Sequence, residues 1–342
     1  MDDLSSFKIV RLNCQLFPVT RFEQATYDRF KIKPLEVELG GEQILSVAED
    51  CDALVVVSEF LSGGVIEGLK QCRVISRMGA GTDKVDHSAA TRNGILITNV
   101  PDFCYEEQAD HAMALLLALV RRLPQMDAAL RDGRWDSGRK SSRTIRRFRD
   151  RVLGLIGFGG SAKALARRAA GFGFRILASR RRDVVDEEAA TLGVEMTDTD
   201  TVIRESDYLS LHLPLNEHTR GMFSAKKLAA MKQGAYFINT ARGAIVDETA
   251  LAALLRSGHL AGAGIDTFEE FSVHGPDGQP PTHPLLDLDN VIVTPHTAAF
   301  SVESSYDVGT GGVENLAAVL SGRWPDRFRV ANKDVTPRFA LS

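Results

Sequence analysis

Six residues near the middle of the chain have the spacing of a turn that binds the phosphates of a dinucleotide. They read Gly157-Phe158-Gly159-Gly160-Ser161-Ala162, the pattern G-x-G-x-x-A. In this pattern Gly157 permits a tight turn, Gly159 lets the backbone approach a pyrophosphate, and Ala162 keeps a helix close to the preceding strand. The N–H groups and dipole at the start of that helix favour an anion. A glycine triplet becomes specific only between a strand and a helix, and both are predicted here.

The residues after the next predicted strand bear on which nicotinamide dinucleotide is bound. A site for NAD usually has Asp or Glu about 20 residues into the unit, where the carboxylate binds ribose hydroxyls. Here Ser179 is followed by Arg180, Arg181 and Arg182. Guanidinium groups bind a phosphate bidentately, whereas a carboxylate would repel it. We therefore expect NADP(H) to be preferred; the alternative is that these arginines are solvated loop residues and NAD(H) is also accepted.

Along most of the chain, short β-branched runs alternate with amphipathic helices. This alternation indicates α/β architecture with parallel sheets. Helices are predicted after the turn at Pro101, over residues 247–257, and over residues 302–320 despite three glycines that weaken helices. The predicted strands cover residues 53–57, 74–76, 95–98, 152–156, 175–179, 208–213, 235–239, 262–267 and 291–294.

The segment from residue 139 to residue 151 differs in composition from its surroundings, because more than half of its residues are basic. Such a run is typical of a solvated, partly mobile connector. A site for an acidic partner is the alternative interpretation.

Composition and charge exclude several classes of function. With 342 residues the chain is long enough for two domains, and 44% hydrophobic residues suffice for a large core. The net charge of −4 does not favour nucleic acid or an anionic membrane. The acidic N-terminus lacks an apolar signal core, and no apolar run is long enough to span a bilayer. The four scattered cysteines argue against zinc and disulfides, so we expect no metal and a cytoplasmic protein.

Three further motifs occur in order in the second half of the chain: NTARG at 239–243, GIDTFEE at 264–270 and TPH at 294–296. Together with GAGTDKVD at 79–86, NVPD at 99–102 and LHLPL at 211–215, they resemble the D-isomer-specific 2-hydroxyacid dehydrogenases. The resemblance covers roughly residues 50 to 320. It implies two Rossmann-like, doubly wound parallel-sheet domains and a homodimer joined through the cofactor domain. The substrate domain would comprise residues 1–101 and 299–342, and the dinucleotide-binding domain residues 102–298.

The resemblance also implies roles for individual residues. Arg242 would bind the substrate carboxylate and carbonyl, and His296 would be the general acid in reduction and the base in oxidation. Either residue alone could be structural; their order downstream of a dinucleotide turn favours the catalytic roles. Backbone N–H groups of Ala80 and Gly81 would hold the substrate carboxylate, whereas His212 is expected to be structural. Expected cofactor-binding residues are Gly157, Gly159, Gly160, Ser161, Ser179, Arg180, Arg181, Pro214, Thr219, Thr240, Ala241 and Asp266.

One position departs from the family pattern. The family pairs its catalytic histidine with a glutamate five residues after the aspartate that matches Asp266, and position 271 is phenylalanine. A shift of one residue would let Glu270 take this role, with Glu269 as the alternative. A glutamate beside the histidine would raise its pKa by favouring the imidazolium.

The expected function is hydride transfer between NADP(H) and a small 2-keto or 2-hydroxy acid, with glyoxylate or hydroxypyruvate as the expected substrate. Because no regulatory domain is expected after residue 342, a large multidomain phosphoglycerate dehydrogenase is disfavoured, although a short NAD-dependent form is not. The second class of function is a dinucleotide-sensing binding protein, similar to the C-terminal-binding-protein corepressors of this family. Substrate-dependent turnover distinguishes the two classes.

Overall fold

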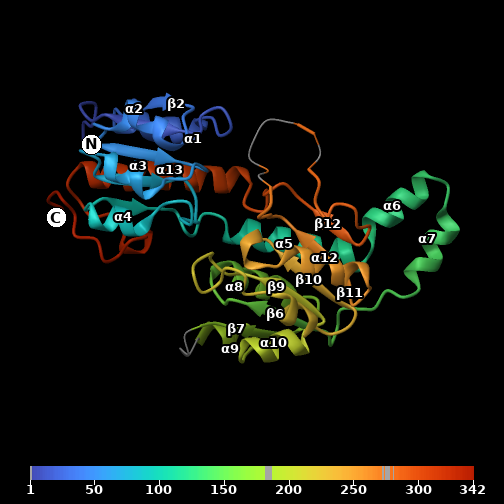
Figure 1. Ribbon diagram of the computed structural model, residues 1–342. Helices are drawn as coiled ribbons and strands as arrows, with labels where there is room; N and C mark the ends of the chain where they lie inside the picture. The colour runs from blue at the N-terminus through green and yellow to red at the C-terminus, as the bar shows by residue number, and fades with distance from the viewer. Residues whose placement is uncertain (1, 182–186, 272, 274–277, 280) are drawn as a thin grey trace. The chain divides into compact units, whose positions relative to one another are not determined.

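The computed structural model describes residues 2–181, 187–271, 273, 278–279 and 281–342. These residues form two compact units (Figure 1). The first unit comprises the described residues up to Cys104 together with Phe300–Ser342. The second comprises the described residues from Tyr105 to Ala299.

The first unit is built on a sheet of five parallel strands in the order β2-β1-β3-β4-β5. The strands are β1 (Ile9–Leu12), β2 (Leu35–Val37), β3 (Ala53–Val56), β4 (Val74–Arg77) and β5 (Leu96–Thr98). The helices are α1 (Arg21–Arg29), α2 (Leu45–Ala48), α3 (Gly63–Gly68), α4 (His87–Arg92) and α13 (Val302–Leu320), with short 3-10 turns η1 (Gly41–Ile44) and η3 (Arg327–Arg329).

Both faces of this sheet are buried, because successive strand residues point to opposite sides. Along β3, Leu54 and Val56 pack in the core that includes residues of α2, α3 and α4. Ala53 and Val55 pack in a second core with residues of α1 and α13.

The glycines of α13 are explained by close packing within the first unit. A Cβ on Gly312 would lie 2.2 Å from Sδ of Met78, and a Cβ on Gly309 would lie 3.2 Å from the backbone nitrogen of Glu23. The helix begins at a capping box in which Ser301 and Ser304 bond each other's backbone amides. The cap and the packing offset the low helix propensity of glycine, and the prediction of a helix over 302–320 is correct.

The second unit is built on a sheet of seven parallel strands in the order β12-β11-β10-β9-β6-β7-β8. The strands are β6 (Val152–Ile156), β7 (Arg175–Ser179), β8 (Val194–Met196), β9 (Tyr208–Leu211), β10 (Ala235–Asn239), β11 (Leu260–Ile265) and β12 (Val291–Val293). The helices are α5 (Tyr105–Val120), α6 (Leu123–Arg131), α7 (Trp135–Ser142), α8 (Gly160–Ala170), α9 (Glu187–Thr191), α10 (Thr199–Glu205), α11 (Ala225–Ala229) and α12 (Glu248–Arg256), with the 3-10 turn η2 (Gly243–Ile245).

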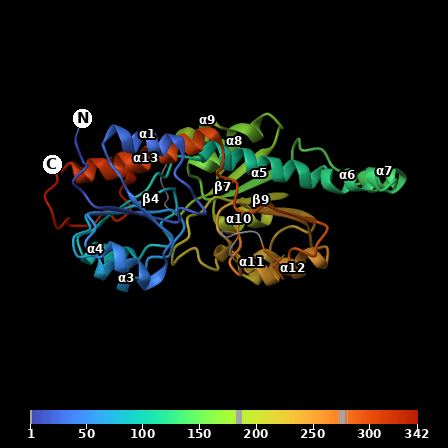
Figure 2. The ribbon, with the colours of Figure 1, turned by 90° about the horizontal axis from the view of Figure 1, so that it is seen from above.

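This sheet is also covered on both faces, as Figure 2 shows for α5 and α8 on one side and α11 and α12 on the other. Leu153 and Leu155 of β6 pack in one core with α5 and α8. Val152 and Ile156 pack in the other core with residues of α10, α11 and α12. Helices α6 and α7 extend away from the sheet of this unit (Figures 1 and 2).

The predicted fold class, two parallel-sheet α/β domains, is confirmed by these two sheets. The predicted strands are present, and their ends differ from the observed ones by at most two residues. Strands β1, β2 and β8 were not predicted. The basic segment also differs from the expected connector, because its first four residues, up to Ser142, belong to α7. No helix in the described parts of the chain combines the length and apolar character needed to cross a bilayer.

Candidate active site

The glycine-rich turn lies between β6 and α8, where the sequence placed it. Gly157 has a φ of 89°, and a Cβ there would lie 2.2 Å from the carbonyl oxygen of His212, so only glycine fits. A Cβ on Gly159 would meet no atom of the described chain within 4 Å, and no side chain caps the helix that starts at Gly160. The turn therefore leaves open space beside the positive end of an eleven-residue helix.

A half-buried histidine, His212, contacts this turn. Nδ1 of His212 lies 3.1 Å from Oγ of Ser161, and Nε2 lies 2.9 Å from Oγ of Ser210. Burial lowers the pKa of His212 to about 4, so the ring is neutral near pH 7. His212 therefore has the structural role expected for it, because its ring connects the first turn of α8 to β9.

The end of β7 lies beside the same turn. The amide of Gly157 donates to the carbonyl of Ser179 at 2.9 Å, and the buried Ser179 hydroxyl accepts from Thr199 at 3.1 Å. Arg180 is half-buried and Arg181 is exposed, while Arg182 lies outside the described residues. Ser179 is thereby fixed beside the phosphate turn, with the two described arginines directly after it.

A loop after β9 contains two further expected cofactor residues. The hydroxyl of Thr219 donates to the carbonyl of Pro214 at 2.7 Å and accepts from the amide of Asn216 at 2.9 Å. These bonds close the loop that begins at the carboxyl end of β9.

Arg242 follows β10 and is held through its backbone. The side chain of Asn239 donates to the carbonyl of Arg242 at 2.9 Å and accepts from the amide of Ala241 at 3.0 Å. The guanidinium Nη1 of Arg242 donates to the carbonyl of Ala241 at 2.8 Å. Thr240 and Ala241 are buried beneath it. A Cβ on Gly243 would lie 2.3 Å from the backbone nitrogen of Glu269, so glycine is required directly after the arginine.

Asp266 is a fully buried carboxylate at the end of β11. It accepts hydrogen bonds from the hydroxyl of Thr294 at 2.5 Å and from the amides of Thr297 and Ala298 at 2.9 and 3.0 Å. Burial raises the pKa of Asp266, and these three hydrogen bonds act in the opposite direction. Nε2 of His111 lies 3.6 Å from the carboxylate and 2.9 Å from the Thr294 hydroxyl.

His296 lies just after β12 with a backbone φ of 56°, which is uncommon for a residue other than glycine. Its amide donates to the carbonyls of Asp266 at 2.9 Å and Thr294 at 3.0 Å. The structure therefore brings His296 and Asp266 together at one end of the sheet. Backbone strain of this kind is concentrated at functional sites.

The acidic pair before Phe271 has other contacts. The Glu269 carboxylate pairs with Arg220 at 2.7 Å, and the Glu270 carboxylate lies 3.7 Å from Nε2 of His283. Phe271 stacks on Phe268, with 4.5 Å between ring centroids. That Glu270 orients His296 stays a prediction.

Sequence reasoning did not identify the histidines at positions 283 and 111. His283 is fully buried, and its Nε2 lies 3.0 Å from the Glu248 carboxylate. Burial raises the pKa of Glu248, and the bond to His283 opposes that shift. The only signal for this pair was an acidic residue at the start of α12 and a histidine 35 positions later, which no motif connects. His111 is half-buried on α5, and no motif of the sequence singles it out.

Ala80 and Gly81 belong to the first unit and follow β4. The side chain of Asn99 donates to the carbonyl of Ala80 at 2.6 Å, and the amide of Val100 donates to the carbonyl of Gly79 at 3.0 Å. Gly79 has a φ of 146°, which a glycine accommodates. This loop is thus fixed by the segment that follows β5.

The expected residues of the second unit share one edge of its sheet. Because all seven strands are parallel, their carboxyl ends meet at that edge, where α/β folds bind ligands. The phosphate turn follows β6, Arg180 follows β7, Arg242 follows β10, and His296 follows β12. The arrangement offers an anion-binding turn, a guanidinium group and an imidazole to a bound molecule.

Comparison with known proteins agrees with this arrangement. The profile of the D-isomer specific 2-hydroxyacid dehydrogenase NAD binding domain matches residues 113–298. A glyoxylate reductase of Korarchaeum cryptofilum is 38% identical over 82% of this chain and 83% of its own. A D-3-phosphoglycerate dehydrogenase of Methanocaldococcus jannaschii is 37% identical over 85% of this chain and 54% of its own.

A solved structure gives the same result for the fold. The D-lactate dehydrogenase of Aquifex aeolicus, complexed with NAD and lactic acid, has a TM-score of 0.80 at 26% identity. The alignment covers 92% of this chain and 96% of that one. Sequence profile, overall identity and fold agree, and the chain belongs to the D-isomer-specific 2-hydroxyacid dehydrogenase family.

Proposed function

We propose that this dehydrogenase reduces a small 2-keto acid with NADP(H) as the preferred cofactor, either glyoxylate to glycolate or hydroxypyruvate to the D-2-hydroxy acid. The observation that carries the proposal is the set of residues at the carboxyl edge of the seven-stranded sheet: the open glycine turn, Arg180, Arg242 and His296. The glyoxylate reductases among its relatives support the choice of substrate.

The residues around the turn fit a dinucleotide. The space beside Gly159 and the uncapped start of α8 suit a pyrophosphate. Arg180 and Arg181 would bind a 2′-phosphate, Ser161 and Ser179 would line the phosphate and ribose positions, and the loop of Pro214 and Thr219 would lie along the adenosine. When bound, the nicotinamide supplies or accepts the hydride.

Arg242 is the residue proposed to bind the substrate. Its guanidinium fork matches a carboxylate, and its charge stabilises the negative oxygen that develops from the keto group. The backbone of Ala80 and Gly81 would hold the same carboxylate. Anchoring of the arginine backbone by Asn239 limits the positions that its side chain can reach.

His296 is the proposed proton donor. In reduction the imidazolium gives its proton to the carbonyl oxygen as hydride reaches the carbonyl carbon, and in oxidation the neutral ring removes the hydroxyl proton. Glu270 is the carboxylate proposed to orient the ring. Asp266 would receive the carboxamide of the nicotinamide at the place where it already fixes the loop after His296.

A second candidate within the same chemistry is oxidation of a phosphoglycerate-type substrate with NAD. The relative from Methanocaldococcus jannaschii favours it, although this chain spans about half of that protein.

We also propose a homodimer formed through the second unit. Helices α6 and α7 carry exposed Leu123, Leu130 and Trp135, which are 55%, 64% and 56% exposed. Exposed apolar side chains gathered on one extension are typical of an interface. Sedimentation of the full chain at several concentrations tests this proposal.

The experiment for the main proposal is a panel of turnover assays on the full chain. NADPH and NADH are each combined with glyoxylate, hydroxypyruvate and larger 2-keto acids, and the configuration of each chiral product is determined. We expect NADPH-dependent reduction of the smallest acids, with the D-configuration in every product that has a stereocentre; glycolate from glyoxylate has none. L-products, or saturable NADPH binding without turnover of any acid, would contradict the proposal, and the latter result would favour a dinucleotide-sensing protein.

A further inference from the structure

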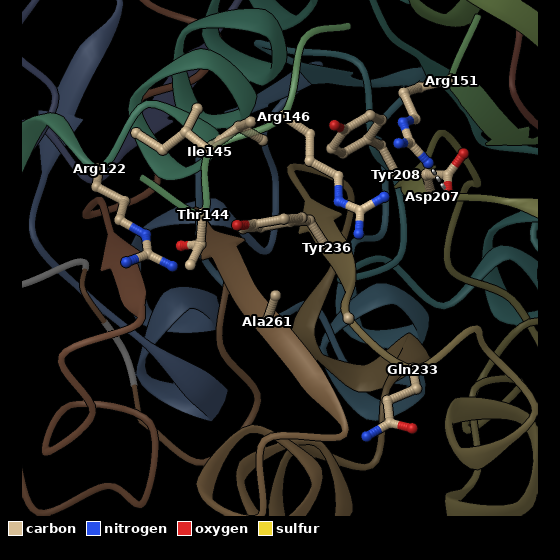
Figure 3. Close-up of a pocket in the computed structure, with 12 residues that line it drawn as sticks. Arg122, Thr144, Ile145, Arg146, Arg151, Asp207, Tyr208, Gln233, Tyr236 and Ala261 are labelled. Carbon is tan, nitrogen blue, oxygen red and sulfur yellow. Dashed lines mark ion pairs between the residues drawn. The ribbon is translucent and has the colours of Figure 1, made fainter. Parts of the chain in front are cut away.

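A cavity of about 350 Å³ lies in the second unit, at the edge of the sheet opposite the proposed cofactor site (Figure 3). Asp207 and Tyr208 line it at the start of β9, Tyr236 at the start of β10, and Arg151 just before β6. Because the strands are parallel, their amino ends form this edge, whereas the glycine turn follows a carboxyl end. The cavity is within the usual size of small-molecule sites, about 300–1,000 Å³.

The lining of the cavity is strongly cationic. Arg122, Arg146 and Arg151 contribute guanidinium groups, and Asp207 is the one carboxylate among the lining residues. Asp207 is already engaged: it accepts from the amide of Val152 at 2.9 Å and lies 3.8 Å from Arg151 and 3.6 Å from Lys232. Two guanidinium charges thus lack a carboxylate among the residues that line the cavity.

The two remaining arginines come from different segments. Arg122 precedes α6 with a φ of 53°, and its Nη1 donates to the carbonyl of Ser141 at 2.9 Å. Arg146 forms no ion pair with any carboxylate in the described portion of the chain. Figure 3 shows the guanidinium groups of Arg122 and Arg146 on the two sides of the Tyr236 ring in this view.

The basic segment is therefore not uniform. Arg146 and Arg151 line the cavity, whereas Arg147 and Arg149 do not; Arg146, Arg147 and Arg149 are all exposed. A merely solvated run would not place two of its arginines around a cavity together with an arginine and two tyrosines from other elements.

We propose that this cavity is a second binding site, for the oxyanion groups of a small organic metabolite. Guanidinium forks bind carboxylate and phosphate oxygens alike, and the phenol hydroxyl groups add hydrogen-bond donors. The volume exceeds that of a single inorganic ion, so the ligand carries its oxyanion groups on a carbon skeleton. The site depends on no residue of the proposed catalytic machinery.

The test uses the full chain saturated with NADPH, so that the dinucleotide site is filled. Inorganic phosphate and citrate are titrated separately by calorimetry and by the melting temperature, with ionic strength held constant by sodium chloride. We expect saturable binding of at least one of these anions. Tighter binding of phosphate identifies a phosphorylated ligand, and tighter binding of citrate identifies a polycarboxylate.

Single substitutions of arginines test whether the anion binds in this cavity. Arg122→Gln and Arg146→Gln should each weaken the preferred anion about tenfold or more, because each removes a charged hydrogen-bond donor. Arg147→Gln, the adjacent arginine outside the cavity, should leave affinity unchanged. If Arg122→Gln lowers the melting temperature without anion, Arg122→Lys replaces it, since it keeps the charge and loses the fork.

Three results would overturn the proposal. Equal weakening by Arg146→Gln and Arg147→Gln would mean diffuse attraction to a basic surface, that is, an adventitious ion only. Non-saturable effects of both anions would mean the same. A change in oligomeric state in the cavity variants, with anion affinity unchanged, would instead assign the cavity to an interface between copies of this chain.

Discussion

The backbone amide of His296 donates to the carbonyl of Asp266 at 2.9 Å, which ties the ends of two neighbouring strands, β11 and β12. The Asp266 side chain then binds the amides of Thr297 and Ala298, the two residues after the histidine. These contacts hold His296 at its unusual φ of 56°. The direction in which the imidazole leaves the backbone is therefore set by a buried carboxylate in the preceding strand end.

Glu270→Gln tests whether the Glu270 carboxylate acts on His296. A nearby carboxylate raises a histidine pKa, so its removal should move the alkaline limb of kcat/KM for keto-acid reduction to lower pH, by roughly one unit. Glu269→Gln, which loses the pair with Arg220, is the matched control. An unchanged pH profile in Glu270→Gln would assign Glu270 to His283 alone.

Arg180→Glu tests the cofactor preference. The substitution places a carboxylate where a 2′-phosphate is proposed to bind, so KM for NADPH should rise about tenfold or more while KM for NADH changes little. Arg204→Glu, an exposed arginine on α10, controls for the change in net charge. Equal effects on both cofactors would show that Arg180 is a loop residue without a role in selectivity.

Much of the fold was predictable because its signals are local. Strands β6, β7 and β10 match their predicted bounds, since each contains a run of apolar residues that packs in the cores on both faces of the sheet. β1 was missed because Arg11 interrupts its apolar run. In the structure Arg11 is buried and paired with Glu23 of α1 at 2.7 Å, a partner that only the tertiary fold supplies. β2 and β8 have three residues each, too few for a periodic signal.

The site residues that belong to sequence motifs were predictable. The residues that only tertiary packing brings together were not. The glycine turn, Arg242 and His296 were identified from ordered motifs. The Glu248–His283 pair could not be, because it joins the first turn of α12 to a distant loop. The cavity of Figure 3 could not be predicted either, since its arginines and tyrosines come from separate strands and connections. From composition alone, the basic segment was predicted to be a solvated connector.

Substitutions of the adjacent Gly159 and Gly160 should have different effects, the first on dinucleotide binding and the second on stability. A Cβ on Gly160 would lie 2.2 Å from Cε2 of Tyr105, so Gly160→Ala should lower the free energy of unfolding by about 1–3 kcal/mol. A Cβ on Gly159 meets no neighbour within 4 Å, so Gly159→Ala should stay folded but bind dinucleotide about tenfold more weakly. Urea unfolding and fluorescence titration with NADPH separate the two effects. Intact dinucleotide binding in Gly159→Ala would argue against a pyrophosphate there.

His212 should make stability depend on pH. Its pKa is about 4 in the folded chain and about 6.5 when unfolded, so the unfolded state binds more protons between these values. The free energy of unfolding should therefore fall as pH decreases from about 6.5 to 4, by roughly 1–3 kcal/mol for this group. His212→Gln should flatten that dependence relative to the parent. Identical slopes in urea melts of the two proteins would contradict the assignment of a neutral His212 ring in the folded chain.

The most direct test of the central claim is the rate of NADPH oxidation with glyoxylate in the parent protein, Arg242→Ala and His296→Ala, with NADPH affinity measured in parallel. We predict parent activity well above that with NADH, and a fall in kcat/KM of about 10²-fold or more in each variant, with NADPH affinity nearly unchanged. Full activity in both variants would contradict the account, because the reaction would then need neither the guanidinium nor the imidazole at the carboxyl edge of the sheet.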